Sequence, residues 1–142
     1  YGDNNAKGVE TGFRRGKEGR GVYFNGLDAY VEIGKSDFDI KRGGESFSIA
    51  LWVYSTEAAS YTNNNSYIAK NKSNGDTVFL FGYIGNQLYI KIGGDAKYIQ
   101  VAGTEPVSTW SHYAITAKEN RNDTDVNIYK NGSQIWAGKI MP

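Results

Sequence analysis

The feature that most constrains this chain is a period-two alternation of apolar and polar residues, repeated in short runs from residue 21 onward. Successive side chains of a β-strand point to opposite faces, so this alternation is typical of strands with one buried face. The run 47–54 is the clearest example. Its predicted core face carries four large apolar side chains: Phe47, Ile49, Leu51 and Val53. Helical periodicity is nearly absent, so the chain is predicted to be β-rich.

Turn dipeptides separate these runs and predict hairpins. Asn131-Gly132 is the strongest of these signals, and the segment 84–87 is predicted to join two further strands. Asn25-Gly26 predicts a hairpin or a tightly bent strand pair from residues 21–24 and 29–33. About nine or ten short strands, spaced by roughly ten residues, predict an all-β fold: an antiparallel two-sheet jelly-roll sandwich.

The predicted organisation is one domain preceded by an arm. Residues 1–20 mix glycine, asparagine and charged residues, which predicts a loosely ordered N-terminal arm. Residues 21–142 show no internal repeat and no composition shift, so they predict a single domain. A chain of 142 residues is long enough for one good hydrophobic core.

Composition excludes several classes of function. The chain has no cysteine and one histidine, His112, which removes disulfides, thiol nucleophiles and most zinc sites. Sixteen basic against fifteen acidic residues give no polycationic signature for nucleic acid. No apolar run approaches the ~20 residues that a membrane-spanning helix needs, so no membrane insertion is expected.

Four segments, in order, carry a resemblance to a known family. They are residues 21–33 (GVYFNGLDAYVEI), 47–53 (FSIALWV), 110–116 (WSHYAIT) and 126–133 (VNIYKNGS). Together they resemble the laminin G-like, concanavalin A-like lectin jelly-roll domains, with the pentraxins as a related group. The resemblance implies the jelly-roll fold and a non-catalytic binding module.

The resemblance also implies that the family's C-terminal strands are lacking. Members of the family continue past the Asn-Gly hairpin, and their terminal strand sits beside the first one. Without it, a backbone edge and an apolar groove are expected near residues 21–33. Three explanations stay open: a trimmed chain, a cleaved chain whose remainder stays bound, or an edge completed by another protein chain.

Catalysis is not expected. Glucanases of related fold share a Glu-x-Asp-x-x-Glu strand motif, and this spacing does not occur here. Asp37 and Asp39 are a pair at strand spacing, but the charges and glycines around them favour a solvated turn. His112 shares a strand face with Trp110 and Ala114, which favours a packed structural histidine over a catalytic base.

A metal site in this chain would have to use oxygen ligands, which suits calcium. Asn74 and Asp76 are the first candidates, because they fall where the resemblance to pentraxins places part of a calcium site. Asp28 is the third candidate, and the Asp123/Asp125 pair offers further oxygen ligands. Turn formation alone explains Asn74-Gly75-Asp76, and capping of its own turn explains Asp28.

Aromatic rings beside amides provide the candidate ligand site. Sugars offer hydroxyls at their edges and C–H groups on their faces, so their sites combine rings with hydrogen-bonding side chains. Loop segments of this chain offer that combination. The candidate ligand-binding residues are Tyr61, Asn63, Tyr67, Asn74, Tyr83 and Tyr89. The alternative for each tyrosine is an ordinary strand residue whose hydroxyl reaches water.

The sequence thus favours a non-catalytic, extracellular or cell-surface module of a larger protein that binds a glycan or glycoprotein. The absence of disulfides favours a prokaryotic source. The alternative is a structural or assembly subunit of a cell-surface or pilus-like structure, whose open edge a partner strand completes. A third reading is a partial glycoside hydrolase.

Overall fold

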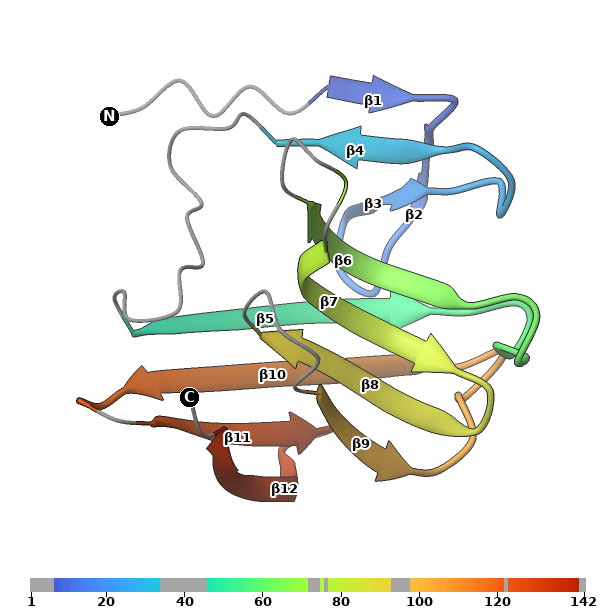
Figure 1. The fold of residues 1–142 in the computed structure, drawn as a ribbon. Coiled ribbons are helices and arrows are strands. Elements are labelled where there is room, and N and C mark those ends of the chain that lie inside the picture. Colours follow the sequence, from blue (N-terminus) through green and yellow to red (C-terminus); the bar gives the residue numbers. More distant parts are fainter. Residues whose placement is uncertain are drawn as a thin grey trace. The chain divides into compact units, whose positions relative to one another are not determined.

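The computed structural model describes residues 7–33, 46–71, 75, 77–92, 98–121 and 123–140. These residues form twelve strands and no helix (Figure 1). Consequently none of them lies in a helix able to cross a membrane. The chain divides into two compact units, Tyr1–Asp39 and Ile40–Pro142. Each unit is described by itself below.

The first unit contains two short antiparallel ribbons. Strand β1 (Lys7–Val9) pairs with β4 (Tyr30–Glu32), and β2 (Gly12–Arg15) pairs with β3 (Arg20–Tyr23). Two strands thus lie within residues 1–20, where the sequence predicts a loosely ordered arm. Alternating apolar runs are absent there, and other contacts stabilise the ribbon.

Those contacts are cation–π interactions across β2 and β3. The guanidinium carbon of Arg14 lies 3.5 Å from the Tyr23 ring centroid, and that of Arg20 lies 5.3 Å from the Phe13 ring centroid. Such contacts stabilise even exposed pairs by roughly 0.5–1 kcal/mol. Alternation of apolar residues gives no indication of these cation–π contacts.

The predicted pairing of residues 21–24 with 29–33 is wrong, because β3 and β4 each pair with an earlier strand. The Asn25 side chain explains the difference. Its Oδ1 accepts hydrogen bonds from the backbone N–H groups of Leu27, Asp28 and Ala29. The signal at Asn25-Gly26 is therefore a real turn, but one that leads from one ribbon to the other.

The second unit is a sandwich of two four-stranded antiparallel sheets (Figure 1). Sheet I has the order β12-β11-β10-β5, and sheet II has the order β6-β7-β8-β9. The strands of sheet I are β5 (Phe47–Tyr54), β10 (Trp110–Glu119), β11 (Thr124–Lys130) and β12 (Ser133–Ile140). The strands of sheet II are β6 (Asn65–Asn71), β7 (Thr77–Ile84), β8 (Gln87–Ile92) and β9 (Tyr98–Ala102).

The core lies between the two sheets and follows the predicted alternation. The predicted core face of β5 packs against it, and the Phe47 ring meets Phe79 of sheet II edge-on at 5.9 Å. Alternate residues of β7, β8, β10 and β11 are fully buried. The largest are Tyr113, Phe79, Phe81, Leu88, Ile90, Ile115 and Ile128. The prediction of an all-β two-sheet sandwich is confirmed.

Two predicted hairpin turns are also confirmed. Asn131 and Gly132 join β11 to β12 with φ angles of 50° and 82°, the left-handed values that a two-residue type I′ turn requires. Gly85, with φ of 55°, joins β7 to β8. A Cβ atom at Gly85 would also come within 3 Å of the Tyr61 ring, so the backbone conformation and the ring contact both favour glycine there.

Candidate functional site

The outer face of sheet I carries aromatic side chains, and the four on β5 and β10 are here called the aromatic face: Trp52, Tyr54, Trp110 and His112. Trp52 lies opposite His112 and Tyr54 lies opposite Trp110 in the β5–β10 register. The ring centroids are 5.0 Å apart in the first pair and 5.4 Å apart in the second, each with planes tilted by 56°. Trp52 and Tyr54 are each 46% exposed, a large fraction for side chains of this size.

Alternation explains why these rings face outward. The odd-numbered side chains of β5 pack on the core, so Trp52 and Tyr54 must point away from it. Their Cα atoms are about 7 Å apart along the strand. The aromatic face therefore consists of two ring pairs, one after the other along the paired strands β5 and β10.

The outer face of sheet I continues from the Trp52–His112 pair toward β11 and β12. Ala50 and Ala114 lie opposite each other beside this pair, and Tyr129 of β11 lies opposite Ala114. A chain of side-chain hydrogen bonds, here called the amide row, crosses β10, β11 and β12: Gln134, Asn127 and Thr116. Gln134 Nε2 donates to Asn127 Oδ1 at 2.9 Å, and Asn127 Nδ2 donates to Thr116 Oγ1 at 3.3 Å. One sheet face thus combines exposed rings with amide and hydroxyl groups.

Three loops meet at the end of the sandwich where β5 ends and β10 begins. Backbone hydrogen bonds connect them in a cycle, here called the loop ring: residues 55–64, 85–86 and 103–109. Gly85 N donates to Ser60 O at 3.2 Å, Gly103 N donates to Asn86 O at 3.0 Å, and Ser108 N donates to Ser55 O at 2.8 Å. The loop ring borders the Tyr54–Trp110 pair in sequence on both strands.

Glu105 is buried inside the loop ring, with 2% of its surface exposed. Its Oε1 accepts hydrogen bonds from Ser55 Oγ and Tyr67 Oη, both at 2.5 Å. Its Oε2 accepts from the Ala59 N–H at 2.8 Å and from Asn65 Nδ2 at 2.7 Å. All four donors are neutral groups, and they come from the end of β5, the following loop and β6.

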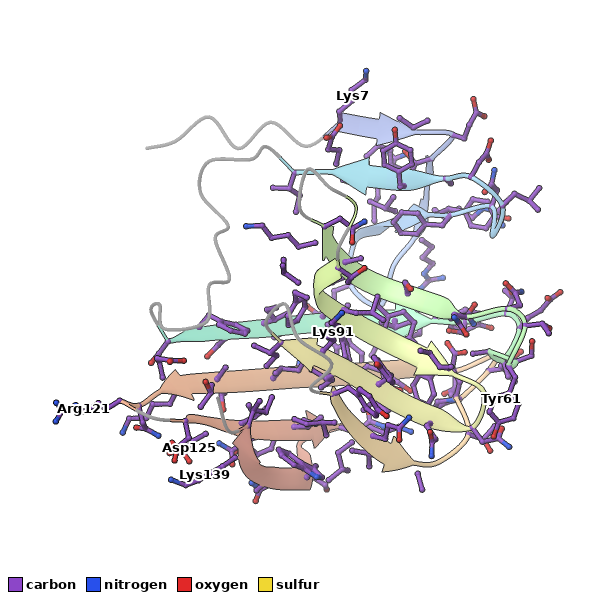
Figure 2. The ribbon with its side chains drawn as sticks, viewed as in Figure 1. Lys7, Tyr61, Lys91, Arg121, Asp125 and Lys139 are labelled. Atoms are coloured by element: carbon purple, nitrogen blue, oxygen red, sulfur yellow. The ribbon has the colours of Figure 1, made fainter. Side chains whose placement is uncertain are left out.

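Two of the predicted ligand residues, Tyr61 and Asn63, lie in the loop ring. Figure 2 shows Tyr61 at this end of the sandwich, where its exposed ring rests against Gly85. The Asn63 backbone closes a tight turn, because its carbonyl accepts from Ser60 N and its N–H donates to Ser60 Oγ. The structure thus brings these two residues together in the loop ring.

Tyr83 requires a correction, because it lies in the core rather than on a binding loop, whereas Tyr67 lies on β6 and is partly buried against the core. Tyr83 is 3% exposed and shares a hydrogen bond with Tyr113, and the Tyr67 ring packs on Phe81 and Tyr113. Burial, and next the hydrogen bond to Glu105, raise the pKa of the Tyr67 phenol. Burial, and next the Tyr113 hydrogen bond, raise the pKa of Tyr83. The buried Tyr83 ring has no face available for a sugar.

Tyr89 lies on the outer face of sheet II, away from the other candidates. Its ring stacks on that of Tyr98, with centroids 5.1 Å apart and planes at 23°. Burial, and next the Tyr98 phenol, raise the pKa of Tyr89. This pair forms a separate aromatic surface.

The calcium candidates gain no support. Asn74 and Asp76 lie outside the described residues, and Asp28 accepts a hydrogen bond from Asn25 Nδ2 within its own turn. Within the described part of the chain, no three carboxyl or imidazole groups gather as a metal site would require. Asp37 and Asp39 also lie outside the described residues.

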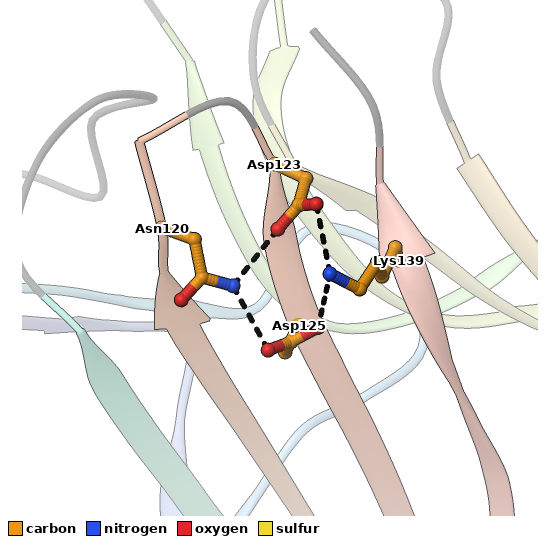
Figure 3. A network of polar contacts seen from close by, with 4 residues as sticks. All are labelled: Asn120, Asp123, Asp125 and Lys139. Carbon is orange, nitrogen blue, oxygen red and sulfur yellow. Dashed lines mark hydrogen bonds and ion pairs between the residues drawn. The ribbon is translucent and has the colours of Figure 1, made fainter.

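The Asp123/Asp125 pair holds a lysine where a cation would bind (Figure 3). Lys139 Nζ lies 2.9 Å from Asp123 Oδ2 and 3.6 Å from Asp125 Oδ1. Asn120 Nδ2 donates to both carboxylates at 2.8 Å. The Lys139 hydrogen bond, and next the Asn120 hydrogen bond, lower the pKa of Asp123. This network explains both aspartates without a metal ion.

A family comparison agrees with this architecture. A family model described as "Concanavalin A-like lectin/glucanases superfamily" matches residues 24–142, most of the chain. The chain belongs to this superfamily. The laminin G-like resemblance of the four sequence segments is thereby confirmed. A search of the curated proteins found no match.

Membership of the concanavalin A-like superfamily supports a carbohydrate-binding or adhesion-type module. Laminin G-like members of the superfamily are generally non-catalytic. In the described residues, sheet I has no strand face that aligns several carboxyl groups as the glucanase motif would. On the outer face of sheet I, the described side chains offer ring contacts and hydrogen-bonding groups.

The candidate ligand residues predicted from the sequence include neither the aromatic face nor Glu105. A signal for the aromatic face was present, since Trp52 and Tyr54 alternate with the core residues of β5. Its completion required the β5–β10 register, which local patterns do not provide. Glu105 stands before a proline in a polar link, and no sequence pattern indicates its burial.

Proposed function

We propose that this chain is a non-catalytic glycan-binding module that contacts its ligand with the aromatic face and the amide row. The observation that carries the proposal is the exposure of Trp52 and Tyr54 on a rigid sheet beside hydrogen-bonding amides. Sugar C–H groups pack on aromatic rings, and sugar hydroxyls bond to amides. An extracellular or cell-surface setting is part of the proposal, because glycan chains are displayed there.

The test is a glycan array followed by calorimetry on the best ligand. Trp52→Ala is expected to weaken binding at least tenfold, equivalent to about 1.4 kcal/mol, because it removes one stacking surface. Tyr54→Ala is expected to act in the same direction. The same samples should release no reducing sugar from a panel of β-glucans. Release by the wild-type chain would contradict the non-catalytic part.

Sheet II supplies a matched control. Tyr98 is 51% exposed and belongs to a stacked aromatic pair, so Tyr98→Ala removes a comparable exposed ring from the other outer face. The Tyr98→Ala variant should bind the glycan with the affinity of the wild type, and circular dichroism should show that all variants are folded. Equal losses in Trp52→Ala and Tyr98→Ala would contradict the assignment to sheet I.

A protein-contact role is the second candidate, and the first unit favours it. No described side chain in residues 7–33 is fully buried, and several large apolar ones are exposed, including Leu27 at 91% and Phe13. Exposed apolar groups gathered in one region are typical of interaction surfaces. Sedimentation velocity tests this role. Concentration-dependent association that Leu27→Asp abolishes would support it, and a stable monomer that binds glycan would contradict it.

A further inference from the structure

Glu105 connects separate segments through a single carboxyl group. Ser55 and Ala59 belong to the β5–β6 connection, Asn65 and Tyr67 belong to β6, and Glu105 itself lies between β9 and β10. A carboxyl group can accept several hydrogen bonds at once, and this one uses both oxygens twice. Its removal would leave buried donors without a partner.

The segments that Glu105 connects are those that hold the outer end of the aromatic face. Ser55 directly follows Tyr54, and Ser108 lies two positions before Trp110. Ser108 has a φ of 56°, a conformation that non-glycine residues rarely adopt, and its N–H bonds to Ser55 O. A strained backbone of this kind persists only where its surroundings fix it.

We propose that Glu105 is the positioning residue of the glycan site. It fixes the loop ring so that Tyr54 and Trp110 hold the geometry that the ligand needs. The inference rests on the proposed function, since it assigns a role to Glu105 through the aromatic face. Glu105 itself is buried, so its carboxyl group is not accessible to a ligand on the surface.

Because all four partners are neutral, a substitution can distinguish an effect of the Glu105 hydrogen bonds from an effect of its charge. A glutamine has the shape of the glutamate. Its carbonyl oxygen can accept from the Ala59 N–H and from Asn65, while its amide nitrogen donates to the hydroxyl oxygens of Ser55 and Tyr67. Glu105→Gln therefore keeps the connections, whereas Glu105→Ala removes all of them.

Amide hydrogen exchange of the free protein is the first measurement. In Glu105→Ala, exchange at Ala59 and Ser108 is expected to accelerate at least tenfold, while the amides of β11 stay protected. Glu105→Gln should restore most of the protection. Unchanged exchange at Ala59 and Ser108 in Glu105→Ala would overturn the inference, and this result does not depend on any ligand.

Affinity for the glycan found with the wild-type chain is the second measurement. Glu105→Ala is expected to bind at least fivefold more weakly, with Glu105→Gln close to the wild type. Faster loop exchange with unchanged affinity would overturn the positioning role. If the wild-type chain binds no glycan at all, the proposed function and this assignment of Glu105 to a glycan site fail together. The exchange data then decide only whether Glu105 orders the loop ring.

Two further comparisons keep the experiment decisive. Thr124→Val removes a buried hydroxyl that donates to Glu119 Oε2 at the opposite end of sheet I, so it lowers stability without touching the loop ring. It should leave the Ala59 exchange and the affinity unchanged. If Glu105→Ala does not fold, Ser55→Ala and Tyr67→Phe each remove one donor, and both should accelerate exchange at Ala59 by a smaller factor. No change in either would overturn the inference.

Discussion

At the end of sheet I where β10 begins, Glu105 is enclosed by protein and accepts hydrogen bonds from four neutral donors. At the other end, Asp123 and Asp125 are partly exposed and bridged by the Lys139 ammonium group (Figure 3). The two ends thus hold carboxyl groups in different ways. The buried one relies on directed hydrogen bonds from neutral donors alone, whereas the partly exposed ones add to the Asn120 hydrogen bonds an ammonium charge that water and salt screen.

The difference teaches where a substitution should matter. A buried donor without a partner costs its full desolvation energy, of about 1–3 kcal/mol. An exposed ion pair contributes little, because water replaces either partner when it is removed. The following predictions test this contrast, starting with the largest expected effect.

Glu105→Ala should produce the largest loss of stability. Several buried donors lose their acceptor, so the free energy of unfolding is expected to fall by about 3 kcal/mol. Urea denaturation followed by Trp fluorescence measures this change. A loss no larger than that of Lys139→Met would remove the contrast between the two ends.

Alkaline pH should destabilise the end of the sandwich that contains Tyr67. Burial is the largest cause that raises the pKa values of Tyr67, Tyr83 and Tyr113 above 10, their ordinary value. The folded chain therefore keeps protons that the unfolded chain releases. The contribution of these phenols is fully present below pH 10 and is lost as the pH rises above it.

The expected slope is about 1.4 kcal/mol of unfolding free energy per pH unit for each phenol that stays protonated in the folded chain. Denaturation midpoints measured between pH 9 and pH 11 check this. Tyr67→Phe should flatten the decline, since it removes one of the titrating groups. A stability that is constant across this range would contradict burial of these phenols.

Asn131→Ala should have an intermediate effect at the β11–β12 turn. Asn131 adopts a φ of 50°, and its Oδ1 accepts a hydrogen bond from the backbone N–H of His112 at 2.8 Å. Alanine disfavours this conformation and cannot accept the bond, so a loss of about 1–2 kcal/mol is expected. Asn131→Gly restores the backbone freedom and should recover part of the loss. Thermal denaturation of the two variants separates the contributions.

Lys139→Met should have the smallest effect. The Lys139 hydrogen bond, first among the causes, lowers the pKa of Asp123, and Asp123 in turn raises the pKa of Lys139. The pair therefore stabilises the folded chain at pH values between the ordinary pKa of aspartate and that of lysine. This stabilisation is lost as the pH falls from the first value to the lowered pKa of Asp123, or rises from the second to the raised pKa of Lys139. Because the pair is exposed, we expect no resolvable shift of the denaturation midpoint at neutral pH. A large, salt-sensitive shift would mean that the two ends behave alike.

Local patterns predicted what depends on neighbours in sequence. Strand β5 begins and ends as predicted at Phe47 and Tyr54, and Asn131-Gly132 forms the predicted turn. The pattern alone also carried a signal for Tyr83, which alternates with Phe79 and Phe81 on the buried face of β7. This alternation favours the core for Tyr83 over the candidate ligand site.

Features that depend on distant segments could not be predicted. The Tyr67 hydroxyl is buried because Glu105 reaches it from another loop, and β4 pairs with β1 although a strong turn signal lies beside β3. In both cases the deciding partner lies far along the chain. The aromatic face belongs to the same class, since each of its ring pairs joins β5 to β10.

The strand order of sheet I has a consequence for how the chain folds. Within the two sheets every pairing connects strands that are neighbours in sequence, except that of β5 with β10. That pairing encloses all of sheet II within one chain loop, and non-local pairings of this kind slow folding. The Trp52 ring lies beside His112 only once β5 has paired with β10. The emission of Trp52 should therefore follow the slow closure of the sandwich, whereas that of Trp136 should follow the β11–β12 hairpin.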